Sequence, residues 1–74
     1  FVILELKRGK TSDAVVGQIL RYIGWVKENL AKPGQSVLGI IISHDIDEGL
    51  KYSISGLKNI RVMKYQVDFQ LNVI

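Results

Sequence analysis

Two charged side chains near the start of the sequence, Glu5 and Lys7, have the types and spacing for hydrolytic chemistry. They stand two residues apart in an apolar run, so on a β-strand they share one face. A carboxylate in such a place can hold Mg²⁺, while a neighbouring ammonium orients or deprotonates the attacking water. The pair predicts metal-assisted phosphodiester hydrolysis. The alternative is an ion pair at a solvent-exposed strand end, which stabilises little.

A second group of polar and aromatic residues follows on the next predicted helix. Gln18 and Tyr22 are four residues apart, so they lie one above the other on the helix. The start of this helix should face the carboxyl end of the preceding strand, where ligands bind in parallel sheets and helix N-termini attract phosphate. Arg21 and Trp25 extend the same flank with a phosphate donor and a base-stacking surface. For Tyr22 and Trp25 the alternative is a place at the edge of the core.

The positive charge of the chain is concentrated near these residues. The formal net charge is +3. Residues 1–32 contain six Lys and Arg against three Asp and Glu, whereas residues 33–74 contain four of each. A local basic excess suits contacts with phosphate. Charge and position therefore make Arg8, Lys10 and Arg21 candidate DNA contacts.

Hydrophobic periodicity predicts the order strand, helix, strand, helix, strand. Right-handed crossovers then give an α/β fold, with a mostly parallel sheet flanked by helices. The helix over residues 13–31 is expected to be capped by Thr11 or Ser12, and the second helix by Asp45 with Glu48 in a capping box. The predicted strands cover residues 1–7 and 36–43 and a C-terminal segment that alternates strictly over residues 65–73.

The strand patterns also predict what surrounds the sheet. Residues 36–43 are apolar on both alternating faces, which is typical of a strand covered by helices on both sides. The C-terminal segment has one apolar and one polar face, so its free edge invites pairing with another chain and favours a homo-oligomer. Ile60 and Val62 are out of phase with that segment, which indicates a bulge or bend near Met63.

Length and composition limit the possible classes of protein. Residues 1–74 are long enough for one domain only, and a core of this size is marginal without oligomerisation or further chain. The absence of cysteine excludes disulfides and thiolate metal sites. No apolar run approaches the roughly 20 residues that span a bilayer, so we expect a cytoplasmic protein with no membrane partner.

Two runs of residues resemble the PD-(D/E)XK nuclease superfamily. They are ILELKRG, from Ile3 to Gly9, and QILRYIGWV, from Gln18 to Val26, which match the E-x-K strand and Q-x-x-x-Y helix of that superfamily. Together with the later GIII and YQVDF strands, they are similar in order to DNA endonucleases of the NucS/EndoMS type. The resemblance implies a partial restriction-endonuclease-like fold.

The resemblance also implies a role for each matching residue. Glu5 would be a metal ligand, the Leu6 carbonyl a second ligand to Mg²⁺ or Mn²⁺, and Lys7 the catalytic lysine. Gln18 and Tyr22 would position phosphate or water. The superfamily's metal-binding aspartate, on the strand before E-x-K, has no counterpart in the sequence, so we expect residues 1–74 to form the C-terminal part of a nuclease-like domain that is inactive alone.

Two hypotheses of function follow, with different consequences. The first is a Mg²⁺-dependent DNA endonuclease domain with Glu5 and Lys7 at its centre. The alternative is a non-catalytic module with a nuclease-like fold, which binds nucleic acid or forms oligomers. Asp45, beside His44, is a candidate for the missing carboxylate, but Asp45 is better explained as a helix cap and His44 as an ordinary turn residue.

Overall fold

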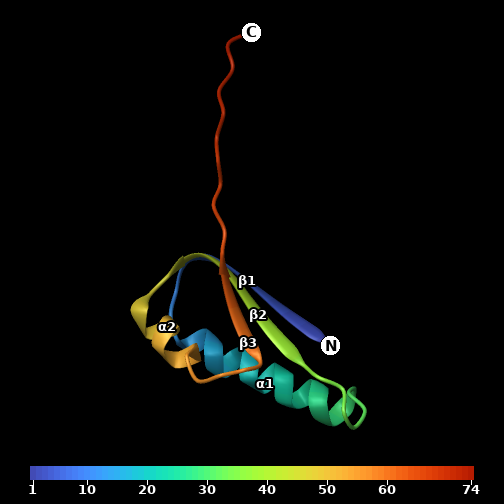
Figure 1. The fold of residues 1–74 in the computed structure, drawn as a ribbon. Coiled ribbons are helices and arrows are strands. Elements are labelled where there is room, and N and C mark those ends of the chain that lie inside the picture. Colours follow the sequence, from blue (N-terminus) through green and yellow to red (C-terminus); the bar gives the residue numbers. More distant parts are fainter.

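The computed structural model describes all of residues 1–74 and confirms the predicted order β-α-β-α-β (Figure 1). Both helices connect successive strands, as the periodicity indicates. Neither helix combines the length and apolarity needed to cross a membrane. The elements are β1 (Val2–Thr11), α1 (Ala14–Asn29), β2 (Leu38–Ile46), α2 (Glu48–Ile54) and β3 (Ile60–Lys64).

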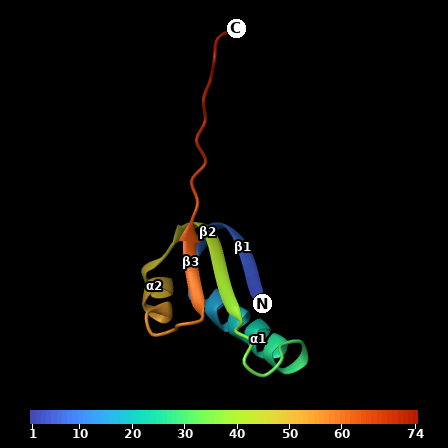
Figure 2. The ribbon, with the colours of Figure 1, turned by 45° about the vertical axis from the view of Figure 1, so that its right-hand side comes forward.

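The three strands form one parallel sheet in the order β1-β2-β3, which confirms the predicted α/β class. In the register, Glu5 lies beside Ile41, and Ser43 of the central strand lies between Lys7 and Lys64. Each crossover moves one strand further in the same direction. Because such connections are right-handed, α1 and α2 lie on the same face of the sheet (Figures 1 and 2).

The core fills the space between the helices and this face of the sheet. The apolar side chains of α1 pack on the central strand, β2, and Leu50 of α2 is buried in the same core. Gly39 allows the close approach of α1, since a Cβ at this position would lie 2.8 Å from the Ile19 Cδ1. The buried core residues are Val15, Val16, Ile19, Ile23, Val37, Ile41, Leu50 and Ile60.

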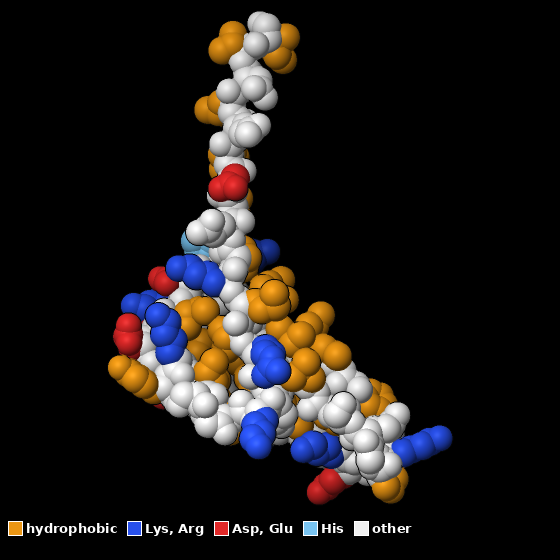
Figure 3. Space-filling model, in the orientation of Figure 1, with side chains coloured by type: hydrophobic (Ala, Val, Ile, Leu, Met, Phe, Trp, Pro, Cys, Tyr) orange, Lys and Arg blue, Asp and Glu red, His pale blue; other side chains and the backbone are white.

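The other face of the sheet carries no helix, so the prediction of helices on both sides is wrong for this chain. The β1 side chains on this face are exposed, at 60% for Val2, 63% for Leu4 and 68% for Leu6. Figure 3 shows hydrophobic side chains gathered over the strands, with Lys and Arg around them. We call this surface the open face; its side chains are Val2, Leu4, Leu6, Leu38, Ile40, Ile42, Arg61 and Met63.

The predicted element boundaries are wrong at the carboxyl ends of β1 and β2. β1 does not end at Lys7 but continues to Thr11, through a register shift between Lys7 and Lys10. Gly9 has a φ of 68° there, a conformation that glycine adopts without strain. Gly9 therefore bends the strand within its length.

The expected helix caps are displaced for the same reason. Thr11 is a buried residue of β1, and α1 begins after Asp13. β2 includes His44 and Asp45, so the cap of α2 is Asp47, whose Oδ1 accepts a hydrogen bond of 2.8 Å from the Leu50 N–H. Asp45 is thus neither a helix cap nor part of a capping box.

The prediction of a strand over residues 65–73 is wrong: the third strand, β3, ends at Lys64, and residues 65–74 leave the sheet without the predicted bulge. β3 pairs with β2 in continuous register from Ile60 to Lys64, and the Tyr65 N–H donates to the Ser43 carbonyl. Ile60 and Val62 face the helices, while Met63 lies on the open face. Beyond this point the chain is extended and has no neighbouring strand (Figure 1). The apolar residues from Tyr65 to Val73 alternate in step with Met63. They are therefore out of step with Ile60 and Val62, which face the helices.

The close approach at Gly39 predicts opposite effects for two glycine-to-alanine substitutions. Gly39→Ala should lower the free energy of unfolding by about 1–2 kcal/mol, because the new methyl overpacks against the buried Ile19. Gly17→Ala, on an exposed part of α1 with nothing within 4 Å, should raise it by about 0.5–1 kcal/mol. Urea unfolding of both variants measures the difference, and equal stabilities would contradict this packing.

Candidate functional site

A hollow of about 240 Å³ lies between the carboxyl end of β1 and the start of α1. Three of its side chains are cationic, and no carboxylate lines it. This basic hollow contains three predicted DNA-contacting or catalytic residues of β1 together with Gln18 of α1. Its lining residues are Lys7, Arg8, Lys10, Thr11, Ser12, Ala14, Val15 and Gln18.

Glu5 stands next to the basic hollow through its ion pair with Lys7. The Lys7 Nζ lies 3.3 Å from the Glu5 Oε1, which confirms that the two side chains share one face of β1. The Glu5 side chain is 21% exposed and that of Lys7 36% exposed, so water reaches both. This face is the one that α1 covers, and Glu5 is the β1 neighbour of the buried Ile41. The pair is therefore neither deeply buried nor freely solvated.

Gln18 joins the hollow to the flank of α1. Its Nε2 donates to the Tyr22 Oη at 3.5 Å, so the two residues meet on one helix face as predicted. Gln18 lines the hollow, whereas Tyr22 is exposed one turn further on. The first turn of α1 contains no acidic residue, although Asp13 stands at its N-cap, and the helix dipole gives this end a partial positive charge. The hollow thus combines three cations with a helix N-terminus.

Two hydroxyl groups, neither of them predicted to belong to the site, hold the bend of β1 beside this hollow. Ser43 and Thr11 are buried and joined through their side-chain oxygens. The Ser43 Oγ also lies 3.3 Å from the Gly9 carbonyl and 2.8 Å from the Asp45 carbonyl. These bonds connect β2 to the irregular part of β1. Ser43 could have been noticed as the polar residue that ends an otherwise apolar strand.

The chain supplies few ligands for a metal ion beside Lys7. No group of three His, Cys, Asp or Glu side chains converges anywhere in residues 1–74. The Phe1 carbonyl accepts from the Leu38 N–H, so in a parallel ladder the alternate carbonyls of Val2, Leu4 and Leu6 point to the free edge. Glu5 and the Leu6 carbonyl could thus hold Mg²⁺ only together with phosphate oxygens and water.

Two predicted DNA-binding residues lie outside the hollow. Arg21 and Trp25 are exposed on α1 and do not line the hollow. Trp25 is 58% exposed, so it is not a core residue either. Both side chains stay on the flank that continues from Gln18 and Tyr22, where an extended ligand could reach them.

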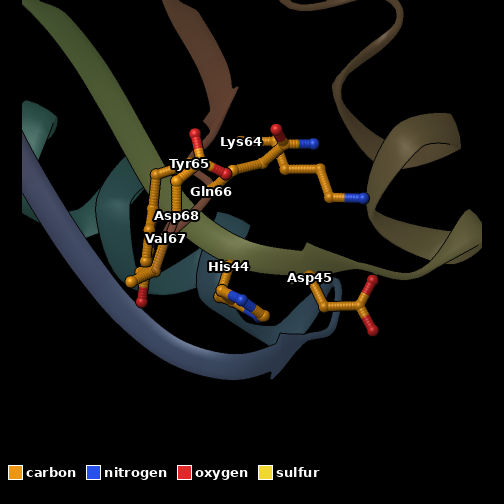
Figure 4. Close-up of a pocket in the computed structure, with 7 residues that line it drawn as sticks. All are labelled: His44, Asp45, Lys64, Tyr65, Gln66, Val67 and Asp68. Atoms are coloured by element: carbon orange, nitrogen blue, oxygen red, sulfur yellow. The ribbon is translucent and has the colours of Figure 1, made fainter. Parts of the chain in front are cut away.

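Asp45 does not replace the missing carboxylate of the predicted metal site. Its Oδ1 accepts a hydrogen bond of 2.9 Å from the Ile46 N–H, and it does not line the basic hollow. It belongs instead to a separate hollow of about 480 Å³ at the base of the C-terminal segment (Figure 4). There the His44 and Tyr65 rings meet edge to face, with centroids 5.4 Å apart.

The chain matches no known protein family, characterised protein or solved structure. The residues and their geometry are therefore the basis for assigning a function.

The hydroxyl pair beside the hollow predicts a site-specific loss of stability. Ser43→Ala removes a buried hydroxyl that bonds the Thr11 hydroxyl and can donate to the Gly9 or the Asp45 carbonyl, so it should lower the free energy of unfolding by about 1–3 kcal/mol. Ser53→Ala, which removes an exposed hydroxyl bonded to the Gly49 carbonyl, should change it by less than about 0.5 kcal/mol. Chemical unfolding distinguishes the two, and a neutral Ser43→Ala would show that these bonds do not hold the bend.

Proposed function

We propose that this chain binds DNA through its phosphates and contributes to a metal-dependent DNA endonuclease. The observation that carries the proposal is the position of the Glu5–Lys7 pair at the basic hollow, where β1 ends and α1 begins. Ligands bind at this edge of open parallel sheets, and helix N-termini favour anions. The resemblance of the E-x-K strand and the Q-x-x-x-Y helix to nucleases supports the same function.

Phosphate is the group that best suits the basic hollow. Lys7, Arg8 and Lys10 offer charged donors from one short stretch of β1, and Gln18 adds a neutral donor from α1. Arginine and lysine bind phosphate oxygens through short, charge-assisted hydrogen bonds. Because these donors come from both a strand and a helix, a phosphate in the hollow would receive hydrogen bonds from more than one side.

Hydrolysis would depend on the groups beside the bound phosphate. A divalent ion held by Glu5, the Leu6 carbonyl and the phosphate itself would supply a Lewis acid for attack on phosphorus. The Lys7 ammonium, 3.3 Å from the Glu5 carboxylate, would orient water and offset charge on the phosphate. Gln18 and Tyr22, which share a hydrogen bond, would hold the phosphate or a water on the other side.

The second candidate function is DNA binding without hydrolysis. It is favoured by the scarcity of carboxylates at the site. No acidic side chain lines the basic hollow, and Glu5 is connected to it only through its ion pair with Lys7. Both candidates use the same phosphate contacts. They differ only in whether bound DNA is cut when Mg²⁺ or Mn²⁺ is present.

A second copy of the chain is the other partner in this proposal. The C-terminal segment is extended and exposed, and its residues alternate between apolar and polar from Tyr65 to Val73. A segment with this alternation forms a stable strand only beside a neighbouring strand. A homo-oligomer would give it one.

Phosphate binding in the hollow predicts a charge-specific loss of DNA affinity. Lys10→Gln should weaken binding of duplex DNA and reduce the magnitude of the slope of log affinity against log salt by about one, since one phosphate contact is lost. Lys58→Gln, at the opposite end of the sheet, removes the same charge and should leave the slope unchanged. Fluorescence anisotropy across a salt series measures both slopes. Equal slopes would place the DNA elsewhere.

Hydrolysis at the Glu5–Lys7 pair predicts that binding and cleavage can be separated. In the longest natural protein that contains this sequence, Lys7→Met should reduce Mg²⁺-dependent cleavage by about 10²-fold or more. Glu5→Gln should abolish cleavage while keeping the affinity for DNA. Glu28→Gln, an exposed change on α1, serves as the control and should retain full activity. A folded protein that binds but does not cut DNA would support the non-catalytic function instead.

A further inference from the structure

Thr11 is the one lining residue of the basic hollow that is both polar and buried. It is 5% exposed, whereas its chain neighbours Lys10 and Ser12 are exposed. A hydrogen bond made by a buried group is stronger than the same bond in water, because the surroundings screen it less. A ligand in the hollow therefore gains more from a bond to Thr11 than from a bond to an exposed hydroxyl.

The Thr11 hydroxyl is bonded to the Ser43 hydroxyl, and the direction of this bond can reverse. Either oxygen of the pair can be the donor. Each hydroxyl has one hydrogen and can also accept. The Ser43 Oγ has two further neighbours, the carbonyls of Gly9 and Asp45, which only accept. When Ser43 donates to one of these carbonyls, Thr11 donates to Ser43. When Ser43 donates to Thr11 instead, the hydrogen of Thr11 is free to bond a group in the hollow.

An anion in the hollow favours the second arrangement. A hydroxyl bonded to a charged oxygen makes a hydrogen bond that is roughly twice as strong as one between neutral groups. The second arrangement gains such a bond at Thr11 and gives up the neutral bond from Ser43 to a carbonyl. Lys7, Arg8 and Lys10 attract an anion to this place, since no carboxylate lines the hollow.

Thr11 also has a fixed position in the fold. Its backbone pairs with Ile46 of β2, and its carbonyl accepts a hydrogen bond of 3.2 Å from the Asp47 N–H. Its branched side chain has few rotamers, and Ser43 holds its hydroxyl. Lysine and arginine side chains, in contrast, lose rotamer freedom when they bind a ligand. Thr11 therefore offers a donor that is already in place.

We propose that Thr11 is a phosphate-binding residue of the basic hollow, with Ser43 donating to it in the bound state. The role of Thr11 rests on the phosphate binding proposed for the same hollow, and the ligand is a phosphate group of the DNA backbone. The charged side chains supply the attraction for phosphate over a distance. The buried hydroxyl determines where the phosphate comes to rest.

The salt dependence of DNA affinity distinguishes this neutral contact from a charged one. In the longest natural protein that contains this sequence, Thr11→Val keeps the shape of the side chain and removes the hydroxyl. It should weaken duplex DNA binding about tenfold at every salt concentration, because a hydrogen bond to a charged group is lost. The slope of log affinity against log salt should stay the same, because no cation is lost. Thr11→Ser, the matched control, keeps the hydroxyl and should keep the affinity. Fluorescence anisotropy without divalent metal ions measures all of these.

A double variant separates the contact from a structural role. Thr11→Val leaves the Ser43 hydroxyl without its partner, which destabilises the fold. Combined with Ser43→Ala it removes both hydroxyls, so neither is left unpaired, and the same tenfold loss at constant slope is expected. If Thr11 only held the bend, its loss would displace Lys7 and Lys10 and reduce the slope. A reduced slope in both variants would therefore overturn the direct contact.

Lys10→Gln separates the role of Thr11 from phosphate binding itself. If Lys10→Gln leaves the slope unchanged, phosphate does not bind in the hollow and both proposals fail. If Lys10→Gln reduces the slope while Thr11→Val binds DNA as tightly as the natural protein, only the role of Thr11 is overturned. A weaker Thr11→Val at constant slope, together with a reduced slope in Lys10→Gln, supports both.

Discussion

The direction of the two crossovers is the constraint from which the rest of this structure follows. Both connections are right-handed and both advance the sheet by one strand in the same direction, so both helices must lie on one face. That face becomes the core, with Ile19 and Ile41 at its centre and Gly39 admitting α1 close to the sheet. The other face is left apolar and open by the same topology. One geometric rule therefore produces both the ordered core and the exposed surface.

The bend at the end of β1 is the second constraint, and it determines where the charged side chains lie. The strand has to leave the sheet and enter α1, yet Thr11 still pairs with Ile46 after the register shift. The positive φ of Gly9 and the buried Ser43–Thr11 pair accommodate this change of direction. As a result, Lys7 and Lys10 lie on the two sides of the bend and line one hollow. A straight strand would have spread them along its length.

Much of the fold could be predicted from the sequence, because its elements have strong local signals. The stripe of Ile19 and Ile23 and the apolar run at Ile41 gave the α/β order correctly. The caps and strand ends were wrong, because tertiary pairing extended β1 to Thr11 and β2 to Ile46 against the local signal of Gly9. Helices on both faces of the sheet were also expected, but one face has none. Periodicity shows that a strand is apolar but not which elements cover it.

The candidate site was predictable to a similar extent. The spacing of Glu5 and Lys7 and that of Gln18 and Tyr22 are local, and both pairs make the predicted contacts. Arg21 and Trp25 share the helix flank but not the hollow, because the hollow covers only the first turns of α1. The hydroxyls of Ser43 and Thr11 meet across 32 residues of sequence, so no local pattern could reveal that pair. DNA binding and cleavage remain predictions from these contacts.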